Sequence, residues 1–393
     1  MTTSTTRPRL IEDTNDLESL CEEIGQEPFY SFDTEFHTER TYFPHLALIQ
    51  LGWAHQTALV DPLAVDPKPL ARLFEGPGVA VAHAAEQDLS ILAAACGVVP
   101  GIVFDTQIAA GFLGLSSPSL ARLVDAMLHI TLPKGDQLSD WTQRPLSERM
   151  ITYAAGDVIH LLALRETITD QLAEVGRLTW ALEECQQVLT ARTKGVVPEE
   201  TWWKLGDIRR LSQRSRGVAQ ELSAWRERRA ATLNRPRRTI LSDLAMQTIV
   251  QRPPKNRQDL EQLRGVDGRH LGQGGAAEIL AAVDRGLNLP PEDLRMPPEG
   301  GDAYAPPAAV AVCTGLVRQI ADELNFDQAL LATRSDIARL LCEQSSRLDE
   351  GWRSDIAGDP IRSLMAGEVA VAFRPDGSLI VEPRQLEAST RSV

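Results

Sequence analysis

Two acidic side chains interrupt an otherwise apolar strand pattern in the stretch FYSFDTEFHTER, residues 29–40. Asp33 and Glu35 alternate there with apolar residues that include Phe32 and Phe36. Because successive side chains of a strand point to opposite faces, the two carboxylates point the same way, one pleat apart. Like charges at that separation repel each other, and their burial is costly. The pair therefore predicts a bound cation, and with it a site for chemistry.

Two further acids occur where helices are expected. Asp88 lies near the start of a helix predicted over residues 85–97, directly after a strand. Asp157 lies on a long helix predicted over residues 146–176, where it shares the apolar stripe with Tyr153, one turn away. An unpaired acid on a buried stripe is disfavoured, so Asp157 also requires a partner.

Each acid taken alone has a simple structural explanation, such as a solvated sheet face, the positive end of a helix or a neighbouring hydrogen-bond donor. Taken together, four carboxylates from one α/β region would form a pocket that only cations can neutralise. A set without Cys or His points to hard ions that prefer oxygen ligands, Mg²⁺ or Mn²⁺. Two such ions about 3.5–4 Å apart are the usual arrangement for in-line attack on a phosphodiester. Asp105, after the strand GIVF, is expected to cap a helix rather than to be a fifth ligand.

The strand and helix patterns around these acids predict a mixed α/β sheet with helices packed on it. Three strand patterns joined by short connections, residues 29–36, 46–53 and 57–62, predict a meander. Further strands at residues 78–84 and 101–106 alternate with helical patterns. A meander followed by strand–helix alternation is typical of a mixed sheet.

Helical patterns replace strand patterns in the second half of the chain. A segment rich in Pro and Gly, residues 296–309, separates two helical sets and is expected to be a linker. The segment 368–383 predicts a hairpin turned at Pro375-Asp376-Gly377. We therefore expect an α/β domain and two small helical domains, at residues 1–200, 210–292 and 308–393.

Charge is distributed unevenly along the chain. The 393 residues have a net charge of −14, but residues 201–240 hold eleven basic and three acidic side chains, a local charge of +8. This stretch is either a solvated helical surface or a contact region for nucleic-acid phosphates. Five scattered Cys without a CxxC pair argue against a zinc site and a disulfide framework. Without a recognisable signal peptide or membrane span, a soluble, reduced, cytoplasmic protein is expected.

Three short motifs resemble those of the DEDD 3′–5′ exonucleases, and within that superfamily those of ribonuclease D. They are FDTEF, HAAEQDLSIL and YAAGDV, the last in the tyrosine form Tyr-x-x-x-Asp. The stretch KGDQLSDWTQRPLSERMITYAAGDV, residues 134–158, is the most specific match to the ribonuclease D pattern. Residues 210–290 resemble an HRDC domain, a nucleic-acid-binding helical module. The last helices resemble a second, degenerate HRDC domain.

The resemblance implies a ribonuclease H-like fold and metal-dependent removal of nucleoside 5′-monophosphates from RNA 3′ ends. It implies that Asp33, Glu35 and Asp157 hold the ion that activates water, and that Asp33 bridges to a second ion near Asp88. Tyr153 would aim the attacking water, because a phenol with a pKa of about 10 is a poor base at neutral pH but a good positioning group. The implied partner is an RNA with a free 3′ end, tRNA precursors above all, with no membrane and no stable protein partner.

The motif-rich loop before the last acid also offers candidate substrate contacts. These are Lys134, Gln137, Trp141 and Arg144. Trp141 is a candidate for stacking on a base, and Arg144 for contacting a phosphate. The alternative is a structured loop that packs against the site without touching the substrate.

Two other functions stay open from the sequence alone. A DNA 3′–5′ exonuclease of the Werner type shares the motifs and the HRDC domain, although the chain contains no helicase motif. An inactive nuclease fold that only binds nucleic acid would be indicated by the loss of an acid, and none of the four is lost.

Overall fold

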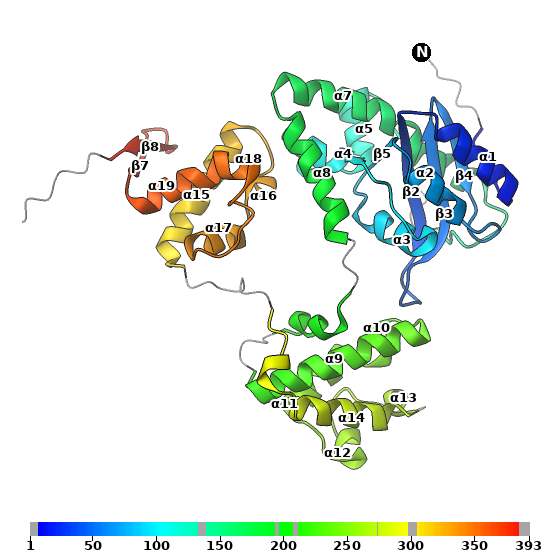
Figure 1. The fold of residues 1–393 in the computed structure, drawn as a ribbon, viewed down its shortest axis with the longest axis vertical. Helices are drawn as coiled ribbons and strands as arrows, with labels where there is room; N and C mark the ends of the chain where they lie inside the picture. Colours follow the sequence, from blue (N-terminus) through cyan, green and yellow to red (C-terminus); the bar gives the residue numbers. More distant parts are fainter. Residues whose placement is uncertain are drawn as a thin grey trace, which may run out of the picture.

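The computed structural model describes residues 7–132, 139–192, 196–206, 211–272, 274–297 and 305–384. These residues form an α/β domain and two groups of helices (Figure 1). Lys134 and Gln137, two of the expected substrate contacts, lie outside the described residues. Among the described helices, none has both the length and the apolar character that crossing a bilayer requires.

A six-stranded mixed sheet forms the centre of the first domain, in the order β1-β4-β3-β2-β5-β6. Strands β2, β3 and β4 are antiparallel, which confirms the predicted meander, and β5 and β6 continue the sheet parallel to β2. Strand β2 therefore lies inside the sheet, fixed by a neighbour on each side. The strands are β1 (Arg9–Ile11), β2 (Phe29–His37), β3 (His45–Trp53), β4 (Gln56–Val60), β5 (Val79–Ala82) and β6 (Val103–Asp105).

Helices cover both faces of the sheet, which confirms the predicted α/β class. Phe32 and Ile49 face a core shared with α1 and α3. On the opposite face, Leu48 packs with Met150 of α6. The helices of this domain are α1 (Thr14–Ile24), α2 (Ala71–Phe74), α3 (Glu86–Cys96), α4 (Thr106–Gly111), α5 (Leu120–Leu128), α6 (Glu148–Ile159), α7 (Leu161–Glu174) and α8 (Leu178–Arg192).

The prediction of a single long helix over residues 146–176 is wrong, because this segment forms two separate helices, α6 and α7, that meet at His160. The break lies beside the carbonyl of Val158, which accepts a hydrogen bond of 2.9 Å from the Ser31 hydroxyl of β2. A hydrogen bond from outside the helix competes for that carbonyl, and such insertions kink helices. The partner comes from another element, so the continuous apolar pattern gave no sign of the break.

The first helical group is built on α9 (Gln213–Leu233), which packs against α14 (Gly275–Leu287). The two backbones meet at Gly217 and Gly286, where a Cβ on either residue would overlap the backbone of the other helix. Only glycine permits this approach. The other elements of the group are η2 (Pro198–Lys204), α10 (Arg237–Ile240), α11 (Asp243–Gln251), α12 (Arg257–Glu261), α13 (Gly268–Leu271) and η4 (Pro291–Asp293).

The C-terminal helices share one hydrophobic core with the first domain. The ring centroids of Phe112 and Trp180 both lie 5.3 Å from that of Trp352, and the Phe326 ring lies 6.0 Å from Trp352. The predicted terminal hairpin is confirmed, with β7 antiparallel to β8. The elements are α15 (Pro307–Glu323), α16 (Gln328–Leu331), α17 (Arg334–Leu341), α18 (Gly351–Arg353), η5 (Ser354–Gly358), α19 (Asp359–Ala366), β7 (Val369–Phe373) and β8 (Leu379–Pro383).

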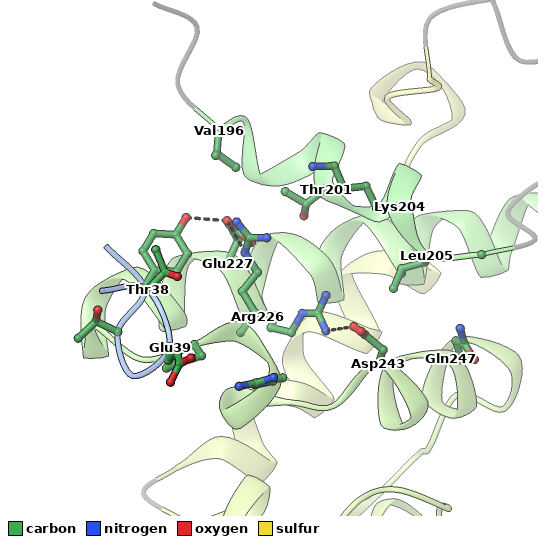
Figure 2. Close-up of a pocket in the computed structure, with 16 residues that line it drawn as sticks. Thr38, Glu39, Val196, Thr201, Lys204, Leu205, Arg226, Glu227, Asp243 and Gln247 are labelled. Atoms are coloured by element: carbon green, nitrogen blue, oxygen red, sulfur yellow. Dashed lines mark hydrogen bonds and ion pairs between the residues drawn. The ribbon is translucent and has the colours of Figure 1, made fainter. Parts of the chain in front are cut away.

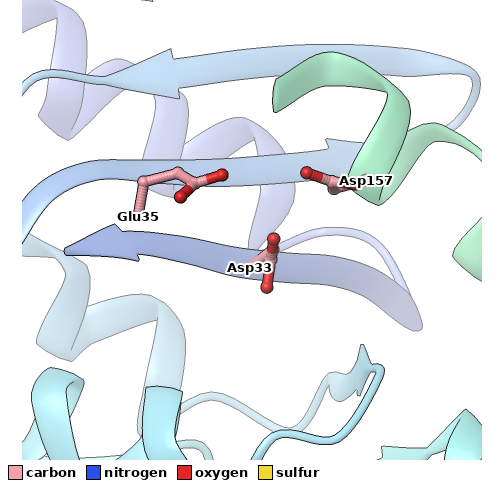
Figure 3. A group of neighbouring side chains, drawn as sticks. All are labelled: Asp33, Glu35 and Asp157. Atoms are coloured by element: carbon pink, nitrogen blue, oxygen red, sulfur yellow. The ribbon is translucent and has the colours of Figure 1, made fainter. Parts of the chain in front are cut away.

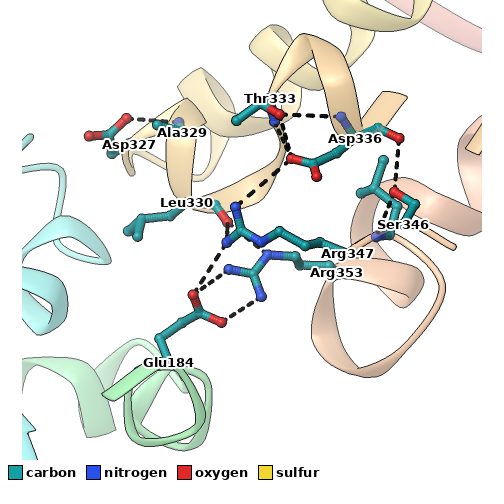
Figure 4. A network of polar contacts seen from close by, with 10 residues as sticks. Glu184, Asp327, Ala329, Leu330, Thr333, Asp336, Ser346, Arg347 and Arg353 are labelled. Atoms are coloured by element: carbon teal, nitrogen blue, oxygen red, sulfur yellow. Dashed lines mark hydrogen bonds and ion pairs between the residues drawn. The ribbon is translucent and has the colours of Figure 1, made fainter. Parts of the chain in front are cut away.

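A buried ion pair reinforces this shared core (Figure 4). The Glu184 carboxylate of α8 lies 2.5 Å from the Arg353 guanidinium and 3.3 Å from that of Arg347. The side chains of Glu184 and Arg353 are only 9% and 4% exposed. Water therefore screens this pair poorly, and each charge depends on the other for compensation.

We expect Arg353→Met to destabilise the full chain by about 3–5 kcal/mol, because Glu184 would then be buried without its main cation. Urea unfolding followed by circular dichroism measures this loss. The double variant Glu184→Leu with Arg353→Met should lose less, since it leaves no uncompensated charge in the interface. A double variant less stable than Arg353→Met alone would contradict this explanation.

Candidate active site

Strand β2 delivers the first two acids to the face of the sheet that α6 covers. Asp33 pairs with Gln50 and Glu35 with Leu48 of β3, so both project on the side where Leu48 packs. The register of β2 and β3 shifts between Glu35 and Phe36, which is a β-bulge. Bulges beside active sites re-aim side chains, and this one lies directly after the second acid.

Helix α6 delivers the third acid from above the sheet. The helix begins at the N-cap Ser147, whose hydroxyl accepts from the Met150 N–H at 3.2 Å. Its buried face, which includes Ala154 and Val158, fixes the rotation of the helix over β3 and β4. Asp157 then points toward β2, and its carboxylate hydrogen-bonds with Tyr153, one turn earlier.

Asp33, Glu35 and Asp157 converge on one point (Figure 3). One carboxylate oxygen of each lies within 4.8 Å of the others, the only such group among the residues that the structure describes. Asp157 also has a buried carboxylate oxygen, Oδ2, without a hydrogen-bond partner among the described residues. Three hard oxygen donors and an unsatisfied buried oxygen fit a divalent cation such as Mg²⁺ or Mn²⁺.

The fourth acid, Asp88, lies beside this group rather than in it. It occupies the first turn of α3 and is 8% exposed. Its carboxylate accepts a short hydrogen bond from the hydroxyl of Thr34, the residue between the two acids of β2. The sequence did not predict this role of Thr34. A hydroxyl residue between two acids of a strand is nevertheless a pattern that indicates a hydrogen-bonding partner for a nearby acid.

Burial raises the pKa values of all four carboxyl groups, and repulsion from neighbouring acids of the set adds to the increase for Asp33 and Glu35. Burial is the main cause for Asp33, whose pKa is raised well above its ordinary value, with further increases from the charges of Asp88, Asp157 and Glu35. The pKa of Glu35 is raised to about 8 by burial and by the charges of Asp157 and Asp88. Burial raises the pKa of Asp157 to about 7 and that of Asp88 to about 6, against the lowering effect of their hydrogen bonds.

The structure does not support Trp141 and Arg144 as direct substrate contacts. Trp141 is 1% exposed and packs in the core under α6, with its ring centroid 5.9 Å from that of Tyr153. The Arg144 guanidinium is engaged by Asp61 and by the Ala47 carbonyl, at 2.7 Å each. Both residues build the wall behind Tyr153, so the alternative of a packed loop fits better.

Asp105 caps α4 as expected, accepting from the Gln107 N–H at 2.8 Å. The sequence gave no sign of its second role. The same carboxylate accepts from the N–H groups of Ala84 and Ala85, at 3.1 and 2.8 Å, where the chain turns into α3. Ala84 has a φ of 58°, a strained value for a residue with a side chain. Asp105 therefore fixes the turn that places Asp88.

Comparisons with known proteins agree with this fold and site. Residues 8–173 match the family model of a 3′–5′ exonuclease domain, and residues 215–283 match that of the HRDC domain. The chain resembles the structure of Escherichia coli RNase D, described as an exoribonuclease involved in structured RNA processing. That likeness has a TM-score of 0.83 and 29% identity, and covers 92% of this chain and 99% of the other. The fold and the site thus define a 3′–5′ exonuclease with an HRDC domain.

Curated relatives narrow this class to one family. The chain is 34% identical over 374 residues to ribonuclease D of Acidiphilium cryptum, covering 93% of this chain and 95% of the relative. It is 35% identical over 382 residues to ribonuclease D of Granulibacter bethesdensis, covering 95% and 96%. The chain belongs to the ribonuclease D family, which confirms the resemblance seen in its motifs. The DNA-exonuclease and inactive-protein alternatives are not favoured.

The raised pKa values predict how stability depends on pH in metal-free protein. A carboxyl group whose pKa is higher in the folded than in the unfolded state stabilises the fold below its unfolded pKa. That contribution is lost as the pH rises through the folded pKa values, about 6 for Asp88, 7 for Asp157 and 8 for Glu35. In EDTA, the melting temperature should therefore fall by several degrees over this pH range, and added Mg²⁺ or Mn²⁺ should reverse most of the fall.

The control is the double variant Asp33→Asn with Glu35→Gln, which removes two of the repelling charges. In EDTA its melting temperature should depend less on pH than that of the wild type, and at pH values above about 8 the variant should be the more stable protein. Parallel pH profiles for the two proteins would show that the repulsion does not control stability.

Proposed function

We propose that this protein removes nucleoside 5′-monophosphates from the 3′ ends of RNA by two-metal-ion hydrolysis. The observation that carries the proposal is the convergence of three carboxylates within 4.8 Å on the fold of a 3′–5′ exonuclease. The ribonuclease D relatives favour RNA over DNA as the substrate. We further propose tRNA precursors as the natural RNA, and the cytoplasm as the location.

The four acids divide into ligands for two ions. Asp33, Glu35 and Asp157 would hold one ion, since their oxygens already converge. Asp33 and Asp88 would hold the second, because the charge of Asp88 acts directly on the Asp33 carboxyl group and raises its pKa. When bound, such ions lower the pKa of water and stabilise the charges that develop on the attacking and leaving oxygens. Mg²⁺ and Mn²⁺ both suit this all-oxygen set.

Tyr153 is proposed to orient the attacking water. Its phenol hydrogen-bonds with Asp157, so it lies at the edge of the carboxylate group. Trp141 packs beside its ring, and the Arg144–Asp61 pair holds the loop that carries Trp141. Because the single O–H of the phenol is donated to Asp157, its oxygen, held from behind in this way, can accept a hydrogen bond from the water in a fixed direction, and fixed direction accelerates attack.

We expect Asp33→Asn and Asp157→Asn to lower the exonuclease rate by at least about 10³-fold, because each removes a charge that an ion requires. Tyr153→Phe should lower kcat by roughly 10²-fold, with little change in KM, because it removes only the orienting hydroxyl. Release of labelled mononucleotides from a 3′-labelled tRNA precursor, with Mg²⁺ or Mn²⁺ and with EDTA, measures both effects.

The matched control is Asp66→Asn, an exposed acid of the same domain that forms an ion pair with Lys68 on the surface. It should leave the rate unchanged. Wild-type turnover by Asp33→Asn or Asp157→Asn in buffer with metal, or full activity of the wild type in EDTA, would overturn the proposed mechanism.

A further inference from the structure

A cleft of about 930 Å³ lies between the loop that follows β2 and the first helical group (Figure 2). The loop after β2 contributes Thr38, Glu39 and Tyr42 to one wall. Lys204 of η2 and Arg238 of α10 lie on the helical side. None of the acids of the candidate active site lines this cleft, so it is a separate feature of the molecule.

Specific contacts hold the two walls together. The Tyr42 hydroxyl donates to Glu227 of α9 at 2.6 Å. The backbone N–H groups of Tyr42 and Phe43 both donate to the Asn234 Oδ1, at 3.1 Å each. Asn234 ends α9 in the left-handed conformation that asparagine tolerates well. The loop is thus anchored at its tip, which gives the cleft defined walls.

The cleft contains two kinds of cation. Arg226 pairs with Asp243 at 2.6 Å, and Arg237 pairs with Glu227 at 2.8 Å. Those charges are compensated within the protein. Lys204 and Arg238 are exposed and have no ion pair or side-chain hydrogen bond within the described part of the chain. These two side chains are free to bind an external anion.

One wall of the cleft follows directly after β2, the strand that carries Asp33 and Glu35. Thr38 follows Glu35 by three residues. An extended chain rises about 3.3 Å per residue, so the cleft wall begins at most about 10 Å from Glu35 along the chain. A base-stacked strand places one phosphate about every 3.4 Å, so this length corresponds to roughly three nucleotides.

We propose that this cleft binds the phosphodiester backbone of the RNA a few nucleotides before the 3′ end that is cut. The proposal rests on the proposed function, and it assigns Lys204 and Arg238 as the phosphate contacts. The acids of the active site repel RNA phosphates that the metal ions do not neutralise. Cations in the adjoining cleft would offset that repulsion and hold the strand. Glu39, in the same cleft and without a cationic partner among the described residues, weakens this binding.

The test compares a long single-stranded RNA with a dinucleotide, whose single phosphodiester occupies the site of hydrolysis and leaves no phosphate for the cleft. For Lys204→Ala with Arg238→Ala, we expect KM for the long RNA to rise by roughly 10- to 30-fold at 0.1 M salt, because two phosphate contacts are lost. The slope of log(kcat/KM) for the long RNA against log[salt] should become shallower by about 1.4. Turnover of the dinucleotide should stay unchanged.

Two variants provide matched comparisons. Arg252→Ala with Lys255→Ala removes the same charge from exposed positions of the same helical group outside the cleft, and should leave KM and the salt slope nearly unchanged. Glu39→Gln should act in the opposite direction and lower KM for the long RNA, since it removes a repelling charge from the cleft.

The outcomes separate the two proposals. If the wild type fails to hydrolyse either RNA, the proposed function fails. If the wild type hydrolyses both, but the cleft variant matches the Arg252/Lys255 variant in KM and salt slope, the cleft proposal is overturned. An equal loss on the dinucleotide would also overturn it, because it would place Lys204 and Arg238 at the site of hydrolysis.

Discussion

The repulsion among Asp33, Glu35 and Asp157 is the constraint on which the first domain depends. Their oxygens are held within 4.8 Å of one another, and burial adds to the cost of ionising them. If these three carboxylates could move freely, their repulsion would drive them apart. They cannot do so because β2 is fixed between two strands and α6 is fixed by its cap and its buried face. A rigid arrangement of mutually repelling acids is what makes a strong site for cations.

Other buried acids of the described chain show the contrasting arrangement. Asp61 is paired with Arg144, and Glu184 with Arg353. Asp105 has four backbone N–H donors instead of a cation. In contrast, within the part of the chain that the structure describes, no basic side chain contributes to the pKa shifts of the three clustered acids. The protein compensates its structural charges internally, and leaves the charges of this one pocket for ions from solution.

The sequence predicted what local periodicity and motif spacing determine. Alternation in β2 and the stripe on α6 were enough to place Asp33, Glu35 and Asp157 on facing elements, and the meander followed from strand lengths and short connections. The features that it missed depend on partners distant in sequence: the bond from Ser31 that accompanies the break at His160, and the pairing of Thr34 with Asp88. Burial of Trp141 likewise depends on α6 and β3, which no local pattern reveals.

The two helical regions relate to the catalytic domain in physically different ways. The C-terminal helices share a hydrophobic core and a buried ion pair with the first domain, so their separation would expose apolar surface and leave both charges without a partner. The first helical group instead meets the loop after β2 at a small contact, where Tyr42 packs against the edge of that group's core and hydrogen-bonds with Glu227, and the loop backbone hydrogen-bonds with Asn234. That loop is continuous with the strand that carries Asp33 and Glu35. An RNA strand bound at that loop would therefore be held at a fixed distance from Asp33 and Glu35, because β2 positions both the loop and the two acids. That distance would determine which phosphodiester reaches the acids.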